Sequence, residues 1–385
     1  MSLADLCSTV RAAGETAVVL VCAHKFLEFR LAEIRSAGVA VGATGMAVLT
    51  TEPPEESLVR KPFVVLPEPP PARSTPQTQS PYVVVRGLHG AQLAALLARC
   101  VCVMYAVEVW GAGADIATCV AATQAADAAL LAPIACDAST TFRVDFESRH
   151  VKVPPAFRRA LMEALAPLEL AAAVDLSHPR ETLAALVEHV PASAHALIRH
   201  TLSAAEAADH VRAVVLGRVV GRGARAALLH KFSLQERKLL GNTSMDPELS
   251  LIMANMGCAR PGALVFDPFC GAGSMLYTCA EFGAMVLGAD INRTVLCGWG
   301  KTSRATRPDV SKRRRADALA GGGASFTNIC ANSTTQPGRR RRKHGGDVCA
   351  VRAGAPLPRP AAERQRAPAL AAAGRLHAAL LGHRH

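Results

Sequence analysis

Hydrophobic and polar positions follow one pattern over roughly the first 200 residues of this chain and another pattern after residue 260. In the first part, short apolar runs predict strands at residues 16–22, 82–86, 101–109, 140–146 and 211–220. Helical spacing or helix-forming composition predicts helices at residues 24–34, 90–99, 115–131, 155–165 and 180–189. This mixed order favours an α+β arrangement with antiparallel strand pairs.

A strand–turn–helix–strand pattern begins near residue 260. Residues 264–266 form a short apolar run, which is typical of a buried parallel strand. Gly271 and Gly273 permit a tight turn and a close approach of the backbone to a ligand. A helix is predicted over residues 275–282, and a second strand over residues 284–288. Together these elements predict a nucleotide-type pocket at a helix N-terminus.

Two aspartates narrow the choice of ligand for this pocket. Asp267 follows the first strand, and Asp290 lies 23 residues later, where an acidic residue can accept hydrogen bonds from ribose hydroxyls. A phosphate-binding P-loop would need lysine after the second glycine, but Ser274 and Met275 follow it. A carboxylate at the strand end favours a cationic or zwitterionic ligand such as S-adenosylmethionine. A dinucleotide and a purely structural turn are the alternatives.

A further helix is predicted just before the pocket. Asp246 is a suitable N-cap, Pro247 suits the first helical position, and Glu248 suits the first turn. The apolar face of this helix is predicted to consist of Leu249, Ile252, Met253 and Met256. Residues 242–244 are expected to line the edge of the pocket, with simple packing of the helix as the alternative.

Composition limits the class of protein. A chain of 385 residues allows two or three domains, and half of its residues are hydrophobic. No apolar run is long enough to cross a membrane, and the first 15 residues lack the apolar core of a signal peptide, so we expect a cytoplasmic protein without membrane contacts. The 12 cysteines show no metal-ligand spacing and are expected to be reduced, mostly buried thiols.

The formal net charge of +12 comes from the C-terminal part of the chain. Up to residue 300 there are 25 Lys and Arg residues against 27 Asp and Glu residues, whereas residues 301–385 contain 18 against 4. The high net charge therefore does not indicate that the folded part binds nucleic acid. Residues 51–81 are rich in Pro, Glu, Ser and Thr and predict a linker.

A set of short motifs runs from residue 24 to about residue 303. The matching segments are residues 26–34, 81–86, 107–111, 231–234, 241–246, 253–255, 267–274 and 282–290. In this order and spacing they resemble the tRNA guanosine-10 N2-methyltransferases that carry a THUMP domain. The motifs are specific jointly, since none of them would suffice alone.

The resemblance implies an α/β protein with four parts. These are a ferredoxin-like module with a proline-rich linker over residues 14–80, a THUMP-like RNA-binding α+β domain over 81–205, an incomplete Rossmann-like methyltransferase domain over 206–305, and a disordered basic low-complexity tail over 306–385. It implies methyl transfer from S-adenosyl-L-methionine to the exocyclic amine of a tRNA guanosine, at position 10. It also implies tRNA as partner and, in eukaryotes, a small zinc-binding activator subunit.

The resemblance also assigns residues. The cofactor-binding set is Asp267, Pro268, Phe269, Gly271, Gly273, Ser274, Asp290, Thr243, Ser244 and Met245. The basic cluster of Lys231, Arg237 and Lys238 is a candidate RNA contact, with an ordinary solvated face as the alternative. Trp110 is expected to be a packing residue rather than a platform for stacking a base.

One family motif is absent from this sequence. The Asp/Asn-Pro-Pro-Tyr tetrad, which holds the amine of the flipped base in the family, does not occur. The catalytic residues are therefore unknown, and we expect this polypeptide to bind S-adenosylmethionine weakly or not at all and to methylate poorly. The resemblance fades after residue 304. Either a genuine basic tail adds phosphate contacts, or the reading frame has slipped between about residues 305 and 335.

Two other classes of function stay open. A non-catalytic tRNA- or RNA-binding protein would use the N-terminal half and the basic tail, and its RNA binding would survive the loss of Asp267. A dinucleotide-dependent oxidoreductase would bind NAD in preference to adenosylmethionine.

Overall fold

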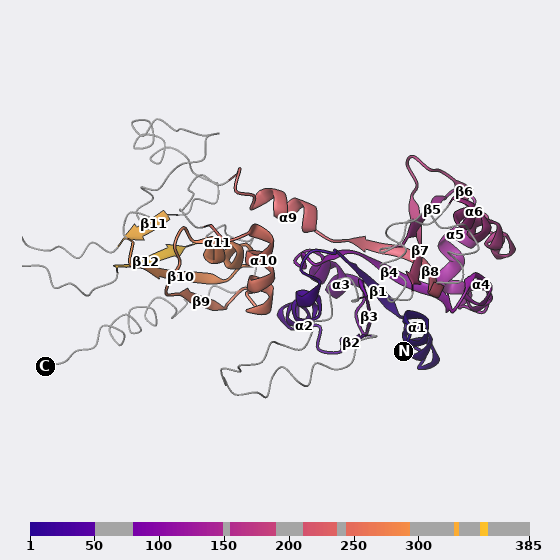
Figure 1. The fold of residues 1–385 in the computed structure, drawn as a ribbon, viewed down its shortest axis with the longest axis horizontal. Helices are drawn as coiled ribbons and strands as arrows, with labels where there is room; N and C mark the ends of the chain where they lie inside the picture. Colours follow the sequence, from indigo (N-terminus) through magenta and orange to yellow (C-terminus); the bar gives the residue numbers. More distant parts are fainter. Residues whose placement is uncertain are drawn as a thin grey trace, which may run out of the picture.

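The computed structural model describes residues 1–50, 80–148, 155–189, 211–236, 244–292, 327–330 and 347–352, the last two ranges by their backbone alone. The strands form two sheets that lie along the long axis of the molecule (Figure 1). One has eight strands in the order β2-β3-β1-β4-β8-β7-β5-β6, and the other has four in the order β11-β12-β10-β9. The mixed α/β character expected from the sequence is confirmed.

The eight-stranded sheet is built from strands spread over two hundred residues. They are β1 (Val18–Cys22), β2 (Ala47–Leu49), β3 (Tyr82–Arg86), β4 (Val103–Gly113), β5 (Thr141–Glu147), β6 (Ala173–Val174), β7 (Glu181–His189) and β8 (Val211–Arg222). The helices of this part are α1 (Leu3–Ala12), the 3-10 turn η1 (Leu27–Phe29), α2 (Arg30–Ala40), α3 (Gly90–Leu97), α4 (Ile116–Gln124), α5 (Ala128–Ala135), α6 (Pro155–Ala164) and the 3-10 turn η3 (Ala166–Leu168). The strands predicted over residues 16–22, 82–86, 101–109, 140–146 and 211–220 are all present.

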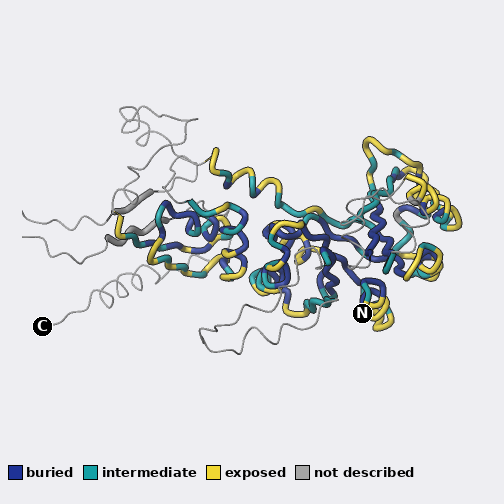
Figure 2. Tube along the Cα trace, in the orientation of Figure 1, coloured by how far each residue is buried: buried dark blue, intermediate teal, exposed yellow. Residues whose placement is uncertain are grey.

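Burial explains why the strand β1 is apolar at every position. Val19 belongs to a cluster with Leu6 of α1, while Val18 belongs to a second cluster with Ile34 of α2 and Leu96 of α3. Helices therefore cover both faces of the sheet at this strand, which favours a continuous rather than an alternating apolar run. Figure 2 shows the resulting buried layer along the centre of the molecule.

The strand β8 connects the two halves of this sheet, since it pairs antiparallel with β4 on one side and with β7 on the other. The expected boundary between residues 205 and 206 stays a prediction, although β8 follows it and pairs with strands that precede it. Trp110 on β4 is fully buried with Ile134, Phe142 and Leu183, as expected of a packing residue.

The prediction of a helix over residues 180–189 is wrong. The segment is the strand β7, which lies between β5 and β8, and its last seven residues are buried. Alanine and leucine give the run a high helix propensity. Pairing on both edges and burial on both faces override that propensity, because strand preference depends on tertiary context.

Two helix boundaries also differ from the prediction. The helix expected from residue 24 begins as α2 at Arg30, because Phe26 has a left-handed backbone with φ 59° and the 3-10 turn η1 follows it. The single helix expected over residues 115–131 is α4 and α5. The carboxylate of Asp127 accepts a hydrogen bond from Ala129 N at 2.9 Å and so caps the second helix.

The smaller sheet contains the pattern predicted after residue 260. Its elements, with the helices that precede or cover it, are α9 (Arg225–Lys231), α10 (Pro247–Met256), β9 (Leu264–Asp267), α11 (Ser274–Glu281), β10 (Met285–Asp290), β11 (Thr327–Cys330) and β12 (Asp347–Arg352). The strands β9 and β10 are parallel and α11 connects them, which is the predicted βαβ unit.

The expectation of a tail without strands is wrong for two segments. The strand β12 pairs antiparallel with β10, and β11 pairs antiparallel with β12. The free edge of β10 presents backbone donors and acceptors that favour such pairing. The expected linker over residues 51–81 and the rest of the expected tail lie almost entirely outside the described residues.

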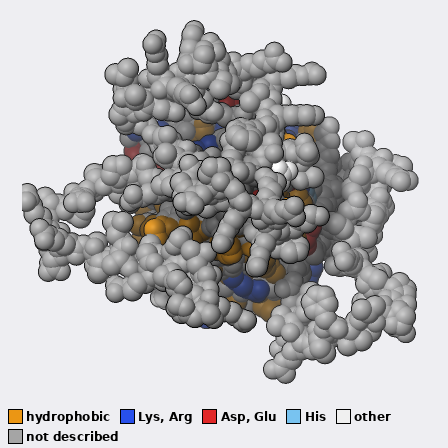
Figure 3. Space-filling model, turned by 90° about the vertical axis from the view of Figure 1, so that its left-hand side faces the viewer, with side chains coloured by type: hydrophobic (Ala, Val, Ile, Leu, Met, Phe, Trp, Pro, Cys, Tyr) orange, Lys and Arg blue, Asp and Glu red, His pale blue; other side chains and the backbone are white. Residues whose placement is uncertain are grey.

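One face of the parallel pair is open, so the prediction of a buried strand over residues 264–266 is wrong in part. The face towards α10 and α11 holds the buried Val286 and the partly buried Val265. On the other face, Leu264, Phe266 and Met285 are 52%, 55% and 63% exposed. Figure 3 views the molecule from this end and shows hydrophobic side chains between the atoms that are not described.

The cysteines give a direct test of this burial. Of the nine cysteines whose side chains the structure describes, seven are buried, Cys136 is exposed and Cys258 is intermediate, and all nine are free thiols. Burial raises the pKa of Cys7 to about 12 and that of Cys119 to about 12. We expect iodoacetamide at pH 8 to label Cys136 rapidly and to leave Cys7 and Cys119 unlabelled until the chain is denatured, as measured by peptide mass spectrometry. Equal labelling of Cys7 and Cys136 in the native protein would contradict this burial.

No helix in the described ranges is long and apolar enough to cross a lipid bilayer.

Candidate cofactor site

The turn between β9 and α11 has the backbone conformation that glycine favours. Gly271 has φ 52° and Gly273 has φ 81°. A side chain at Gly271 would meet no atom within 4 Å, so the backbone conformation is what restricts this position to glycine. Gly273 is the N-cap of α11 and supplies no side-chain acceptor. The first amide groups of the helix therefore lack the side-chain cap that many helices have, and a ligand can replace it.

Asp290 ties this turn to the end of β10. Its Oδ2 accepts a hydrogen bond from Gly271 N at 2.8 Å, and its Oδ1 accepts one from Asn292 N at 2.7 Å. The backbone N–H of Cys270 also donates to the carbonyl of Ala289 at 2.9 Å. The carboxyl ends of the two parallel strands are thus held together. Each carboxylate oxygen has two lone pairs, so Asp290 keeps acceptor capacity for a ligand hydroxyl.

Asp267 lies at the end of the neighbouring strand. Its Oδ1 accepts a hydrogen bond from Phe269 N at 3.0 Å, which stabilises the start of the turn. Neither Asp267 nor Asp290 has an ion-pair partner among the described residues. Two carboxylates at the ligand-binding edge of a parallel sheet favour a cationic group there and disfavour a pyrophosphate.

A glycine that the sequence analysis did not single out makes the close packing of the turn possible. Gly288 pairs with Asp267 across the two strands. A Cβ atom at Gly288 would lie 2.5 Å from Leu276 Cδ1 and 2.9 Å from Cys270 Cβ. A glycine inside a predicted strand was the available signal for such a close approach.

The remaining cofactor candidates lie at different depths. Ser274 is buried at the start of α11 and Met245 is half-buried, while Phe269 is 85% exposed. Pro268 is also exposed, and Thr243 lies outside the described residues. Ile291, which the sequence analysis did not identify, is 96% exposed directly after Asp290. Two exposed apolar side chains therefore lie close in sequence to the two aspartates. Phe269 is two residues after Asp267, and Ile291 is the residue after Asp290.

Ser244 provides a test of fit for a ligand. Its hydroxyl oxygen is buried and has no hydrogen-bond partner in the structure as described. Buried polar groups are normally satisfied, so an unsatisfied hydroxyl indicates a missing partner such as a ligand or water. The residues present therefore fit a polar small molecule, and the contact of Ser244 with the cofactor stays a prediction.

The candidate RNA contacts receive less support from the geometry. The ammonium group of Lys231 lies 2.7 and 2.6 Å from the two carboxylate oxygens of Glu281, so its charge is already compensated by an acidic partner on α11. Arg237 and Lys238 lie outside the described residues. Their role in RNA binding stays a prediction.

A buried polar network joins the eight-stranded sheet to the cofactor unit. Asn255 of α10 donates to Glu33 Oε1 of α2 at 2.8 Å and to the carbonyl of Arg99 at 2.9 Å. Arg99 Nε donates back to Asn255 Oδ1 at 2.8 Å, and its Nη2 donates to the carbonyl of Ala259 at 2.7 Å. Glu33 and Asn255 are fully buried. The helices α2 and α10 lie side by side at this contact (Figure 1).

This network corrects the predicted apolar face of α10. Met253 and Met256 were expected to be buried, but each is 40% exposed. Ile252 of the predicted face is buried, as expected, and so is Leu251, which was not predicted; both pack with Leu228. The buried side of α10 is the side that contacts α2 and Leu228. The sequence alone does not show which side of the helix makes these contacts.

The comparisons with known proteins address both parts of the chain. A family profile described as the Tmrp11 THUMP N-terminal domain matches residues 74–225, which begin before β3 and end just after β8. Over 292 residues the chain is 27% identical to the human tRNA (guanine(10)-N(2))-methyltransferase TRMT11, covering 74% of this chain and 54% of the human protein. The chain is a THUMP-domain relative of the tRNA (guanine(10)-N(2))-methyltransferases. This confirms the family expected from the sequence motifs.

Two further similarities were found, one to a curated protein and one to a solved structure. The chain is 51% identical over 79 residues to a Schizosaccharomyces pombe protein named tRNA (guanine(10)-N(2))-methyltransferase, covering 20% of this chain and 17% of that protein. Its fold is similar to the crystal structure of TrmN from Thermus thermophilus with a TM-score of 0.38 and 16% identity, covering 73% of this chain and 67% of that one. The chain spans about half the length of the vertebrate relatives that it matches over most of its own length.

Proposed function

We propose that this chain supplies the tRNA-binding and cofactor-binding parts of a methyltransferase that modifies the exocyclic amine of a tRNA guanosine, at position 10. The observation that carries the proposal is the glycine turn of Gly271 and Gly273, which Asp290 holds beside Asp267 at the edge of a parallel sheet. The THUMP match in the same chain supports RNA as the substrate class.

S-adenosylmethionine fits this site and, when bound, supplies a methyl group on a positively charged sulfur. Asp290 would accept hydrogen bonds from its ribose hydroxyls, and Asp267 would attract its cationic part. The backbone of the glycine turn would approach it closely, and Ser244 would gain a hydrogen-bond partner. Ser274, at the start of α11, stands where the helix N-terminus can bind a polar group of the ligand.

The network of Glu33, Arg99 and Asn255 gives the proposed enzyme a fixed internal geometry. A methyltransferase that recognises RNA with one domain and holds the methyl donor in another must keep the two at a constant separation. A buried, fully hydrogen-bonded contact between the domains provides that rigidity better than an exposed one. Asn255 is in this proposal a positioning residue that does not touch the cofactor.

The acceptor of the amine protons cannot be named within this sequence, because the Asp/Asn-Pro-Pro-Tyr tetrad is absent. We therefore keep the expectation of weak adenosylmethionine binding and poor methylation for the polypeptide as written. A normal rate of methyl transfer to unmodified tRNA, measured with isotope-labelled S-adenosylmethionine, would contradict it. The described residues contain no cluster that could hold a metal ion, and a zinc-binding activator subunit stays a prediction from the family.

Calorimetric titration tests the cofactor assignment separately from turnover. We expect S-adenosylmethionine to bind more tightly than NAD, because the two carboxylates disfavour a pyrophosphate. Asp267→Asn removes one negative charge from the partly exposed site and should weaken adenosylmethionine binding about tenfold, or about 1.4 kcal/mol. Asp137→Asn, in an exposed turn near β5, is the matched control and should bind like the wild type. Tighter binding of NAD than of adenosylmethionine would favour an oxidoreductase instead.

A non-catalytic RNA-binding protein is the second candidate, because the THUMP match is independent of the cofactor site. It predicts tRNA binding without any binding of adenosylmethionine. The same titration, combined with a tRNA-binding assay on the same preparation, distinguishes the two.

A further inference from the structure

A polar hollow of about 510 Å³ opens at one end of the eight-stranded sheet, where β5, β7 and β8 lie next to one another. Its walls consist of Arg143 on β5, the loop of residues 177–180, Thr182 at the start of β7 and Val219–Arg222 at the end of β8. The sequence analysis did not identify this site, because its residues come from three strands that are distant along the chain.

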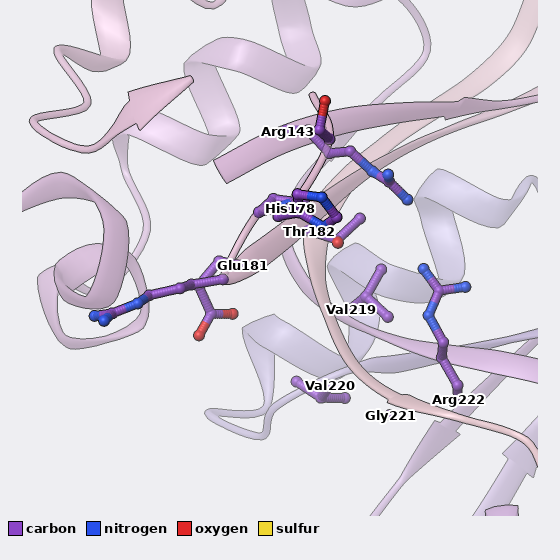
Figure 4. Close-up of a pocket in the computed structure, with 11 residues that line it drawn as sticks. Arg143, His178, Glu181, Thr182, Val219, Val220, Gly221 and Arg222 are labelled. Carbon is purple, nitrogen blue, oxygen red and sulfur yellow. The ribbon is translucent and has the colours of Figure 1, made fainter. Parts of the chain in front are cut away.

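The strand register explains why these side chains meet. Arg143 pairs directly with Thr182 on the neighbouring strand, and Leu183 pairs with Arg218 on the strand beyond. The strand β8 continues past the start of β7, so that Arg222 extends beyond the paired region of the two strands. In Figure 4 the guanidinium groups of Arg143 and Arg222 point towards the same space, and His178 and Thr182 lie to one side of it.

The charges in the hollow are not balanced. Arg143 forms an ion pair with Asp145, with Nε at 3.0 Å from Oδ1. The acid of the wall, Glu181, lies 3.8 Å from a second arginine, Arg218, which also pairs with Glu108 at 3.1 Å. The guanidinium group of Arg222 has no hydrogen bond or ion pair within the part of the chain that the structure describes. Among the residues that line the hollow, Arg143, Arg180 and Arg222 are positively charged and Glu181 is the one acid, so the lining itself carries excess positive charge.

This chemistry selects an anion with several oxygen acceptors. The planar guanidinium group of Arg222 can offer parallel N–H donors to the oxygens of a phosphate group. Arg143 already pairs with Asp145 through Nε and Nη2, so it can add only its remaining N–H groups. The hydroxyl of Thr182 and the ring nitrogens of His178 can add further hydrogen bonds. No Phe, Tyr or Trp is among the described residues that line the hollow, so the stacking of a base on a large aromatic ring is not favoured there. Contacts of this kind position a nucleic acid without reading its sequence.

We propose that Arg143 and Arg222 bind a backbone phosphate of the RNA substrate, with His178 and Thr182 as additional donors. This inference rests on the proposed function, which supplies RNA as the ligand. It places an RNA-binding site on the eight-stranded sheet itself, whereas the sequence pointed to Lys231, Arg237 and Lys238. Arg222 is the arginine of this site that has no acidic partner among the described residues, since Arg143 pairs with Asp145. The site lies within the segment that matches the THUMP profile.

Binding of an unmodified tRNA transcript to the full chain, measured by fluorescence anisotropy at several salt concentrations, tests the proposal. We expect Arg222→Ala to weaken binding about tenfold and to reduce the dependence of log Kd on log salt by about one phosphate contact. The double variant with Arg143→Ala should bind more weakly still. Arg158→Ala removes the same charge from an exposed position on α6 and should change Kd less than about twofold.

The thermal unfolding midpoint of Arg222→Ala should equal that of the wild type, because the substitution breaks no hydrogen bond or ion pair among the described residues.

Wild-type Kd and salt dependence in both Arg222→Ala and the double variant would overturn the proposal while leaving the proposed function intact. Competition by polyglutamate as strong as that by RNA would overturn the phosphate assignment. Loss of tRNA binding in the variants, together with no adenosylmethionine binding by the wild type, would support the phosphate site and leave the cofactor site of this chain without support. A wild-type chain that binds no tRNA would overturn both.

Discussion

Replacing Glu33 with alanine is expected to lower the free energy of unfolding by at least about 3 kcal/mol. The Glu33 carboxylate is fully buried and accepts hydrogen bonds from Val101 N at 2.9 Å, Cys102 N at 2.8 Å and Asn255 Nδ2 at 2.8 Å. Alanine leaves these donors without that acceptor, and each unsatisfied buried donor costs about 1–3 kcal/mol. Burial already disfavours the charged form of Arg99 and lowers its pKa, and the substitution also removes the nearby negative charge of Glu33.

Urea unfolding followed by circular dichroism measures this loss. Glu28→Ala provides the matched control, since Glu28 is an exposed glutamate five residues earlier, and its replacement should change stability by less than about 0.5 kcal/mol. Glu33→Gln keeps an acceptor oxygen, so its free energy of unfolding should lie between those of Glu33→Ala and Glu28→Ala. If the network also joins the domains as described, limited proteolysis of Glu33→Ala should cut between residues 225 and 247 faster than in Glu28→Ala. Equal stability of Glu33→Ala and Glu28→Ala would show that the network is not formed in solution.

In the Asp290→Ala variant, the affinity for S-adenosylmethionine is expected to fall about a hundredfold, or about 3 kcal/mol. The substitution removes the acceptor proposed for the ribose hydroxyls. It also releases the N–H groups of Gly271 and Asn292, so the turn no longer has the geometry that admits the ligand. Hydrogen bonds to a charged group contribute about 1.5–3 kcal/mol each, which makes this the largest effect expected on cofactor binding.

Calorimetry measures the affinity, and thermal unfolding of the same preparation separates a local from a global effect. Asp290→Asn keeps one acceptor oxygen and should lose less affinity than Asp290→Ala. Asp137→Ala removes a carboxylate that caps an exposed turn through Ser139 and Thr140, so it tests whether any aspartate change has the same effect. Wild-type affinity in a folded Asp290→Ala variant would exclude Asp290 as a cofactor ligand.

The cofactor turn could be predicted because its chemistry is local. Gly271, Gly273 and Asp290 belong to one βαβ unit, and the positive φ angles of the two glycines are those that the predicted tight turn requires. The hydrogen bond from Gly271 N to Asp290, 19 residues later, was not predicted. The strand β7 could not be predicted in the same way. Its alanines and leucines favour a helix in isolation, and only its neighbours β5 and β8 make it a strand.

The sequence by itself determined the family, the order of most strands and helices, and the residues of the glycine turn, because propensity, periodicity and short motifs act over a few residues. The tertiary structure alone decided which face of α10 is buried, that Asn255 bonds to Glu33 of α2, and that Arg143 and Arg222 share one hollow. Glu33 and Asn255 are 222 positions apart in the sequence, and Arg143 and Arg222, which line the same hollow, are 79 positions apart. Such contacts are determined by how whole strands and helices pack, so a local sequence pattern does not predict them.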